Sequence, residues 1–211
     1  KRYEILSFYF ASSSAVYGDH GDNKINECTG PLMPISNYGA MKLASEAICF
    51  SSLESFLKDL RIYRFPNVVG MPATHGVILD FINKLIKNPK ELEVLGNGSQ
   101  RKSYLHVEDL IEGMIFLSQR DLKNDENPIF NLGPNNDYVT VQWIAEQTVN
   151  VVSKSANIIY GENDRGWLGD IPKFIYDTRK SNLAGWQPKL NSKESILKAI
   201  KEISQYHVKN L

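Results

Sequence analysis

An α/β fold with a doubly wound parallel sheet is predicted by the way apolar runs and amphipathic stretches alternate along this chain. Residues 5–11 form an apolar run that ends in small polar residues, as a buried parallel strand does. Residues 34–37, which read PISN, cap a helix that runs to about residue 58, and residues 60–65 form the next apolar run. A strand, a helix and a strand in this order are typical of a parallel sheet covered by helices.

The rest of the chain continues this alternation and adds elements that predict α+β decoration toward its C-terminal end. Residues 18–34, rich in Asp, Asn, Gly and Pro, predict a long loop. Further strands are expected over residues 92–95, 129–132 and 158–160. Further helices are expected over residues 78–87, 107–118, 140–155, 178–186 and 192–206.

Composition excludes several classes of protein. The 211 residues include 24 Lys and Arg and 24 Asp and Glu, so the net charge is zero and no basic surface for nucleic acid is predicted. The apolar runs are too short to cross a bilayer, and no signal-peptide pattern follows the first residues. Cys28 and Cys49 have no metal-ligand spacing, so neither a metal site nor a disulfide scaffold is expected. We expect a cytoplasmic globular protein.

Two short stretches carry the chemistry. Residues 10–18 read FASSSAVYG, a strand that runs into a polar turn at Ser13, and residues 38–42 read YGAMK at the start of a helix. Tyr38 and Lys42 lie four residues apart, on one helix face. A phenol ordinarily titrates near ~10, and a nearby ammonium favours its ionised form. Such a pair, with a serine hydroxyl, is suited to moving a proton on a sugar hydroxyl while a cofactor accepts hydride.

Each of these features also has a plain structural explanation. Ser13 alone is compatible with an ordinary strand-end turn, and the pair of Tyr38 and Lys42 with a solvated helix face. A tyrosine followed four residues later by a lysine occurs by chance about once in a chain of this composition. Tyr176 and Lys180 are a second such pair, without a serine-tipped strand before them, and we interpret them as that chance match.

The order of motifs resembles that of the extended short-chain dehydrogenases/reductases, and within them the UDP-glucose 4-epimerase group. The SSSAVYG and NYGAMK stretches resemble the family's active-site signature. The resemblance continues through RFPNVVG (64–70), QRKSYLHVED (100–109), RGWLGDIP (165–172) and LAGWQP (183–188). It implies a partial Rossmann-type doubly wound sheet with a smaller C-terminal α+β substrate-binding domain. Residues 1–70 would carry the catalytic part of the NAD-binding domain, and residues 71–211 mainly the nucleotide-sugar region.

The resemblance also implies roles for individual residues. It implies that Ser13, Tyr38 and Lys42 are catalytic and that the last two bind NAD. The segment with Phe65, Asn67 and Val68 resembles the one that passes between nicotinamide and substrate. The implied UDP-sugar contacts are Ser13, Ser14, Asn67, Arg101, Arg165, Asp170 and Phe174. Of these, Arg101 and Arg165 resemble the diphosphate-binding arginines, and Asp170 resembles the carboxylate that accepts ribose hydroxyls.

The family resemblance leaves the reaction open, and Ala15 narrows it. Relatives that dehydrate or decarboxylate the sugar carry an extra acid after the catalytic hydroxyl, where this chain has Ser14 and Ala15. We therefore expect a 4-epimerase acting by transient NAD-dependent oxidation at C4. UDP-glucose and UDP-galactose are the expected pair, because Phe174 stands where epimerases that exclude N-acetyl sugars carry an aromatic ring. A 4,6-dehydratase, another epimerase of the family and a non-catalytic nucleotide-sugar-binding module stay open as alternatives.

The front of the chain departs from the family pattern. Family members begin with a glycine-rich βαβ unit that binds NAD, and no such stretch precedes the serine strand here. We therefore expect that the chain is inactive alone, that its first strand has an exposed edge, and that a separate N-terminal half is a possible partner. Full-length family members pair through the helix of Tyr38, so the resemblance implies a homodimer in which Leu43, Ala47 and Phe50 contribute either to the interface or to the core.

Overall fold

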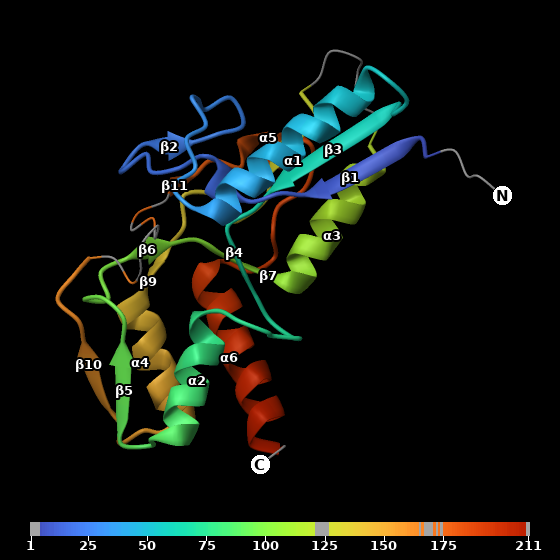
Figure 1. Ribbon diagram of the computed structural model, residues 1–211. Coiled ribbons are helices and arrows are strands. Elements are labelled where there is room, and N and C mark those ends of the chain that lie inside the picture. Colours follow the sequence, from blue (N-terminus) through green and yellow to red (C-terminus); the bar gives the residue numbers. More distant parts are fainter. Residues whose placement is uncertain are drawn as a thin grey trace.

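Three parallel strands form the central sheet of the protein (Figure 1). The computed structural model describes residues 5–120, 127–164, 166, 171, 173 and 175–209. The strands are β1 (Ser7–Ala11), β3 (Asp59–Arg64) and β8 (Ile129–Asn131), in the order β1-β3-β8. Both pairings are parallel. The predicted α/β class with a parallel sheet is confirmed.

Helices cover both faces of this sheet. Alternate residues of a strand point to opposite faces, so Ile62 and Tyr63 of β3 pack in different cores. Ile62 packs in a cluster with Cys49 and Leu53 of α1 (Asn37–Leu53). Tyr63 packs in another cluster with residues of α3 (Val107–Ser118), and its hydroxyl donates to the Met114 carbonyl at 3.1 Å. The strands are thus held between α1 and α3.

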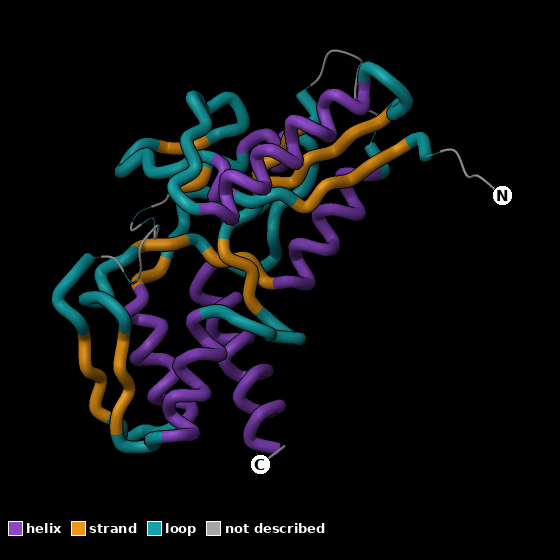
Figure 2. The backbone as a smooth tube through the Cα atoms, viewed as in Figure 1, coloured by secondary structure: helices purple, strands orange, loops and turns teal. Residues whose placement is uncertain are grey.

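A helical layer with its own core lies beside the sheet (Figure 2). It consists of α2 (Val77–Lys87), α4 (Val141–Val152) and α6 (Ser192–Lys209), flanked by the parallel pair β5 (Glu91–Val94) and β10 (Asn157–Tyr160). Fully buried side chains such as Ile82, Ile144 and Ile200 join the three helices. This layer stands below the carboxyl ends of the central strands.

Short elements connect the two layers. The parallel pairs are β2 (Lys24–Ile25) with β11 (Ile175–Tyr176), and β4 (Asn67–Val69) with β7 (Tyr104–His106). The antiparallel pair is β6 (Arg101–Lys102) with β9 (Val139–Thr140). A 3-10 turn, η1 (Ser14–Val16), follows β1, and the short helix α5 (Arg179–Leu183) follows β11.

Two sequence-based expectations differ from the structure. The segment predicted as a long loop over 18–34 contains β2, which pairs with a strand about 150 residues away, a partner that local composition does not reveal. The first helix ends at Leu53 rather than near residue 58. There the carbonyl of Ser52 accepts from the backbone N–H of Ser55, Phe56 and Leu57, which closes the helix as a turn. The Ser51 and Ser52 side chains compete for the carbonyl of Ile48 in the same turn.

The strand β1 lies at the edge of the described sheet, as the sequence predicts. Among the described residues it pairs with β3 alone. Its apolar side chains are correspondingly open to solvent: Phe8 is 43% exposed and Tyr9 40%. An exposed apolar edge of this kind favours pairing with another strand. The division into domains after residue 70 stays a prediction.

Candidate functional site

The serine turn lies where β1 reaches the carboxyl end of the sheet. The backbone N–H of Ser12 donates to the carbonyl of Tyr63 at 2.8 Å, and that of Ser14 to Phe65 at 3.0 Å, so the turn still follows the neighbouring strand. The Ser13 Oγ accepts from the Ala15 N–H at 3.2 Å and caps η1. In open α/β sheets ligands bind at this end of the strands. Ser13, Ser14 and Ala15 line the wall of a cleft with a volume of about 990 Å³.

The helix α1 brings Tyr38 to the same cleft. Ser36 caps the helix, because its Oγ accepts from the Gly39 N–H at 3.1 Å. Tyr38 follows in the first turn, is 55% exposed and lines the cleft. Lys42 lies one turn further along, with its Nζ 5.8 Å from the centre of the Tyr38 ring and 5.0 Å from that of Phe10. It also donates to the carbonyl of Ala11 at 2.8 Å, which ties the ammonium to the end of β1.

Gly39 lets this helix approach the serine turn closely. A Cβ at this position would lie 2.5 Å from the carbonyl oxygen of Ala15 and 2.9 Å from the Cβ of Pro34. Such distances leave no space for any side chain. The glycine in the YGAMK stretch is therefore required for the packing of Tyr38 against the Ser13 turn. Sequence reasoning missed this role of Gly39.

The segment after β3 forms the next part of the cleft wall. Phe65, Asn67 and Val68 all line the cleft. Asn67 and Val68 belong to β4, which is held in place by parallel pairing with Tyr104 and Leu105 of β7. The structure thus brings the predicted cofactor-facing segment and the Ser13–Tyr38 pair to one cavity.

The residues around β6 are divided between two faces. Gln100, Lys102 and Tyr104 line the cleft, whereas Arg101 is exposed, does not line it and lies with its guanidinium carbon 5.4 Å from the ring centre of Tyr138. Side chains alternate along a strand, so neighbouring residues point to opposite faces. Lys102 rather than Arg101 therefore lines the cleft, and the contact of Arg101 with the substrate diphosphate stays a prediction.

Three of the predicted contacts, Arg165, Asp170 and Phe174, lie outside the described residues. Gly166 and Ile171, which are described, line the cleft. Tyr176 and Lys180 have structural partners: the Tyr176 hydroxyl donates to the Arg64 carbonyl at 2.5 Å, and Lys180 donates to the Ile129 carbonyl at 2.7 Å. Neither of these two side chains lines the cleft.

The described residues contain no group of His, Cys, Asp and Glu side chains that would hold a metal ion. None of their helices is long and apolar enough to cross a membrane.

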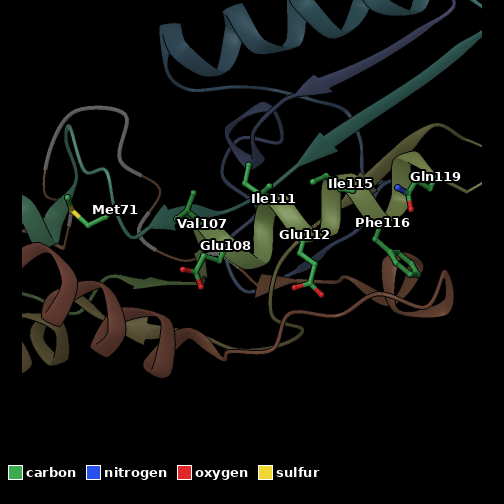
Figure 3. A pocket seen from close by; sticks show the side chains of 8 residues that line it. All are labelled: Met71, Val107, Glu108, Ile111, Glu112, Ile115, Phe116 and Gln119. Carbon is green, nitrogen blue, oxygen red and sulfur yellow. The ribbon is translucent and has the colours of Figure 1, made fainter.

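A second hollow runs along α3 (Figure 3). Ile111 and Ile115 lie on one side of the helix there, and Glu108 and Glu112 on the other. Its lining is mainly apolar and lacks the hydroxyls of the first cleft. It is therefore a less suitable site for a polar substrate.

The chain is similar in sequence and fold to known proteins. The sequence model of the NAD dependent epimerase/dehydratase family matches residues 1–133. A putative UDP-glucose 4-epimerase of Methanocaldococcus jannaschii is 26% identical over 95% of this chain, and human dTDP-D-glucose 4,6-dehydratase is 25% identical over 93%. The crystal structure of a UDP-galactose 4-epimerase superposes with a TM-score of 0.80 at 33% identity over 96% of this chain. The chain spans 64%, 56% and 64% of the lengths of these three proteins, respectively.

Proposed function

Because the chain belongs to the NAD-dependent epimerase/dehydratase family, we propose that it takes part in the 4-epimerisation of a nucleotide sugar, with UDP-glucose and UDP-galactose as the substrate pair. One observation carries this proposal. The Ser13 turn and Tyr38 face one cleft, and Lys42 is held directly behind Tyr38 by the end of β1. A hydroxyl, a phenol and an ammonium in this arrangement are equipped to move a proton on a sugar hydroxyl.

The residues present fit the nicotinamide-facing part of NAD. An ammonium has three donors, and the Lys42 Nζ, which donates to the Ala11 carbonyl, has others that suit a ribose diol. Phe65 and Val68 offer apolar surface beside Tyr38 along the same cleft. NAD supplies the hydride acceptor, since no side chain performs that step.

Each catalytic side chain has one task in this mechanism. Tyr38 removes the proton of the sugar 4-hydroxyl as the C4 hydride leaves, and it returns that proton after the 4-keto sugar has turned over. Ser13 donates a hydrogen bond to the same oxygen and holds it against the phenol. Lys42 favours the phenolate by its charge. Bound NAD would accept the C4 hydride and return it to the opposite face, so the net reaction would invert one centre and consume no cofactor.

Dehydration is the second candidate reaction, because a 4,6-dehydratase is among the relatives at similar identity. Eliminating water requires an acid on the leaving oxygen. Ala15 lines the cleft directly after Ser13 and Ser14, and its methyl group cannot transfer a proton. This residue favours epimerisation.

We further propose that Lys102 contacts the substrate diphosphate together with Asn67. Both line the cleft, and an ammonium is a suitable charge for a phosphate group. Arg165 is still proposed to bind the diphosphate and Asp170 to bind the ribose hydroxyls, and both proposals depend only on the sequence motif. The preference for sugars without an N-acetyl group likewise depends on the sequence position of Phe174.

In this proposal, turnover requires a further polypeptide portion that binds NAD and is not among the described residues. Two apolar surfaces are suited to receive it: the open edge of β1, and the side of α3 where Ile111 and Ile115 are 50% and 54% exposed. A homodimer through α1 is the proposed assembly. Met41 and Ile48 on that helix are 71% and 67% exposed.

The experiment is a product analysis with UDP-galactose and NAD. The chain is assayed alone and together with an N-terminal NAD-binding portion of the family type, and products are identified by NMR. We expect UDP-glucose in the combined reaction only. A 4-keto-6-deoxy product would establish the dehydratase instead. Binding of UDP-galactose without turnover in either reaction would favour the non-catalytic binding module.

A further inference from the structure

A buried ion pair beneath the cleft joins the helix of Tyr38 to the end of β3. Glu46 on α1 and Arg64 on β3 are each 2% exposed. The Arg64 Nε donates to Glu46 Oε1 at 2.9 Å, and its Nη2 donates to Oε2 at 2.6 Å. A two-point contact between planar groups fixes both distance and orientation.

The serine turn provides a third member of this cluster. Ser12 is fully buried, and its Oγ donates to Glu46 Oε1 at 2.5 Å. Ser12 stands between Ala11, whose carbonyl accepts from Lys42, and the proposed catalytic Ser13. Glu46 lies one turn after Lys42 on the same helix face. Two successive turns of the helix therefore bond to the strand end and the serine turn: Lys42 bonds to Ala11, and Glu46 bonds to Ser12.

Tyr17, the last large residue of the serine motif, packs its ring against the guanidinium of Arg64. Its ring centre lies 4.7 Å from the guanidinium carbon, and its hydroxyl donates to Asn131 Oδ1 at 2.7 Å. Burial alone lowers the pKa of Arg64, but the hydrogen bonds and charge of Glu46 and the interactions with Tyr17 together outweigh this effect and raise the pKa. The guanidinium thus stays charged in the interior.

A buried ion pair contributes little net stability, because desolvation opposes the attraction of the charges. A two-point contact between planar groups does, however, restrict the geometry of the segments that carry them. We propose that Ser12, Glu46 and Arg64 are positioning residues that fix the Ser13 turn relative to Tyr38 and Lys42. The structural part of this inference, that the three residues fix the turn, does not depend on the proposed function. Its catalytic part, an effect on turnover, rests on the proposed function.

Local amide exchange, followed by mass spectrometry on the full chain, tests the positioning itself. The variants are Ser12→Ala, which removes one hydroxyl, and Arg64→Lys, which removes the two-point contact. Arg61→Lys is the matched control, because Arg61 is on the same strand, is 4% exposed and pairs with Asp59 away from the serine turn. We expect exchange in residues 12–16 and 37–42 to accelerate by roughly tenfold in both test variants.

The helical layer is the internal reference. Exchange in residues 78–85 and 196–203 stays unchanged in all variants, and Arg61→Lys leaves 12–16 and 37–42 unchanged. Equal acceleration everywhere would show a general stabilising role and overturn the inference. Unchanged exchange at 12–16 in both test variants would overturn it as well.

A kinetic comparison then tests the catalytic consequence. In the combined reaction with the NAD-binding portion, Ser12→Ala lowers kcat and leaves KM for UDP-galactose near its original value. An unchanged kcat, despite faster local exchange, would contradict positioning for catalysis. If the unaltered protein shows no turnover, the proposed function fails, while the exchange experiment still decides whether the cluster fixes the turn.

Discussion

The Nζ of Lys42 donates a hydrogen bond of 2.8 Å to the backbone carbonyl of Ala11, the last residue of β1. This contact links the two sequence stretches that carry the proposed chemistry. It places the ammonium behind the Tyr38 ring while Tyr38 itself stays open to the cleft. The helix and the strand therefore present their functional groups to one space, although 25 residues separate Ser13 from Tyr38.

The two tyrosine–lysine pairs provide a matched comparison. Tyr38→Phe is expected to lower turnover by about 10³-fold with an unchanged melting temperature, because Tyr38 is exposed and its phenol is the proposed proton carrier. Tyr176→Phe is expected to keep turnover and lose about 1 kcal/mol of stability, because its hydroxyl bonds to the Arg64 carbonyl. Kinetics and thermal unfolding of both variants are the measurement. The reverse pattern would contradict the assignment.

Lys102 and Arg101 are neighbours on β6 but face different surroundings. Lys102→Ala is expected to weaken binding of UDP-galactose by about tenfold or more, because a charge-assisted contact to phosphate is lost. Arg101→Ala is expected to change the affinity little, since Arg101 contacts Tyr138 outside the cleft. Isothermal titration of both variants measures the difference. A larger loss of affinity in Arg101→Ala would support the sequence-based assignment of Arg101 and contradict the proposal for Lys102.

A side chain at position 39 is expected to clash with the serine turn. Gly39→Ala places a Cβ 2.5 Å from the Ala15 carbonyl oxygen, so the helix and the serine turn must separate. We expect a loss of about 1–3 kcal/mol in the free energy of unfolding and a lower kcat. Gly30→Ala is the control, because nothing lies within 4 Å of a Cβ there. Equal stability of the two variants in chemical denaturation would argue against the close approach.

Tyr17 predicts a decline of stability at alkaline pH. Burial raises the pKa of Tyr17 from 10.0 to about 12. Above pH 10 the unfolded chain loses this proton while the folded chain keeps it, so stability is complete below 10 and is lost as pH rises toward 12. Two pH units correspond to about 3 kcal/mol. Tyr17→Phe should make the decline less steep in urea unfolding between pH 9 and 11, while the buried Tyr63 and Tyr176, whose pKa values are also raised, still contribute to it. An unchanged slope would refute the buried phenol as its source.

Much of the fold follows from local sequence, and the missing parts have physical reasons. The N-cap at Ser36 and the apolar run of β3 are local features, so they were predicted within a few residues. The strand β2 was not predicted, because its two residues are defined by their partner β11. Helix α1 ends early because its serines compete for the backbone.

The sequence motifs identify candidate residues that lie together at the cleft. Residues whose role depends on contacts between distant segments cannot be identified from the motifs. Ser13, Tyr38 and Asn67 all line the cleft, while the roles that their motifs predict stay predictions. The role of Gly39 depends on a contact with another segment, which spacing alone does not show. Glu46 was not considered, because a glutamate on a helix is usually solvated, and only the fold brings it to Arg64.

Transfer of the C4 hydrogen tests the central claim most directly. UDP-galactose deuterated at C4 is incubated with NAD and the protein combined with its NAD-binding portion, and the UDP-glucose formed is examined by NMR and mass spectrometry. Reversible oxidation at C4 predicts that deuterium is retained at C4 of the inverted product, with no exchange with water. Loss of the label to solvent, or its appearance at C6 of a 4-keto-6-deoxy sugar, would contradict the epimerase mechanism.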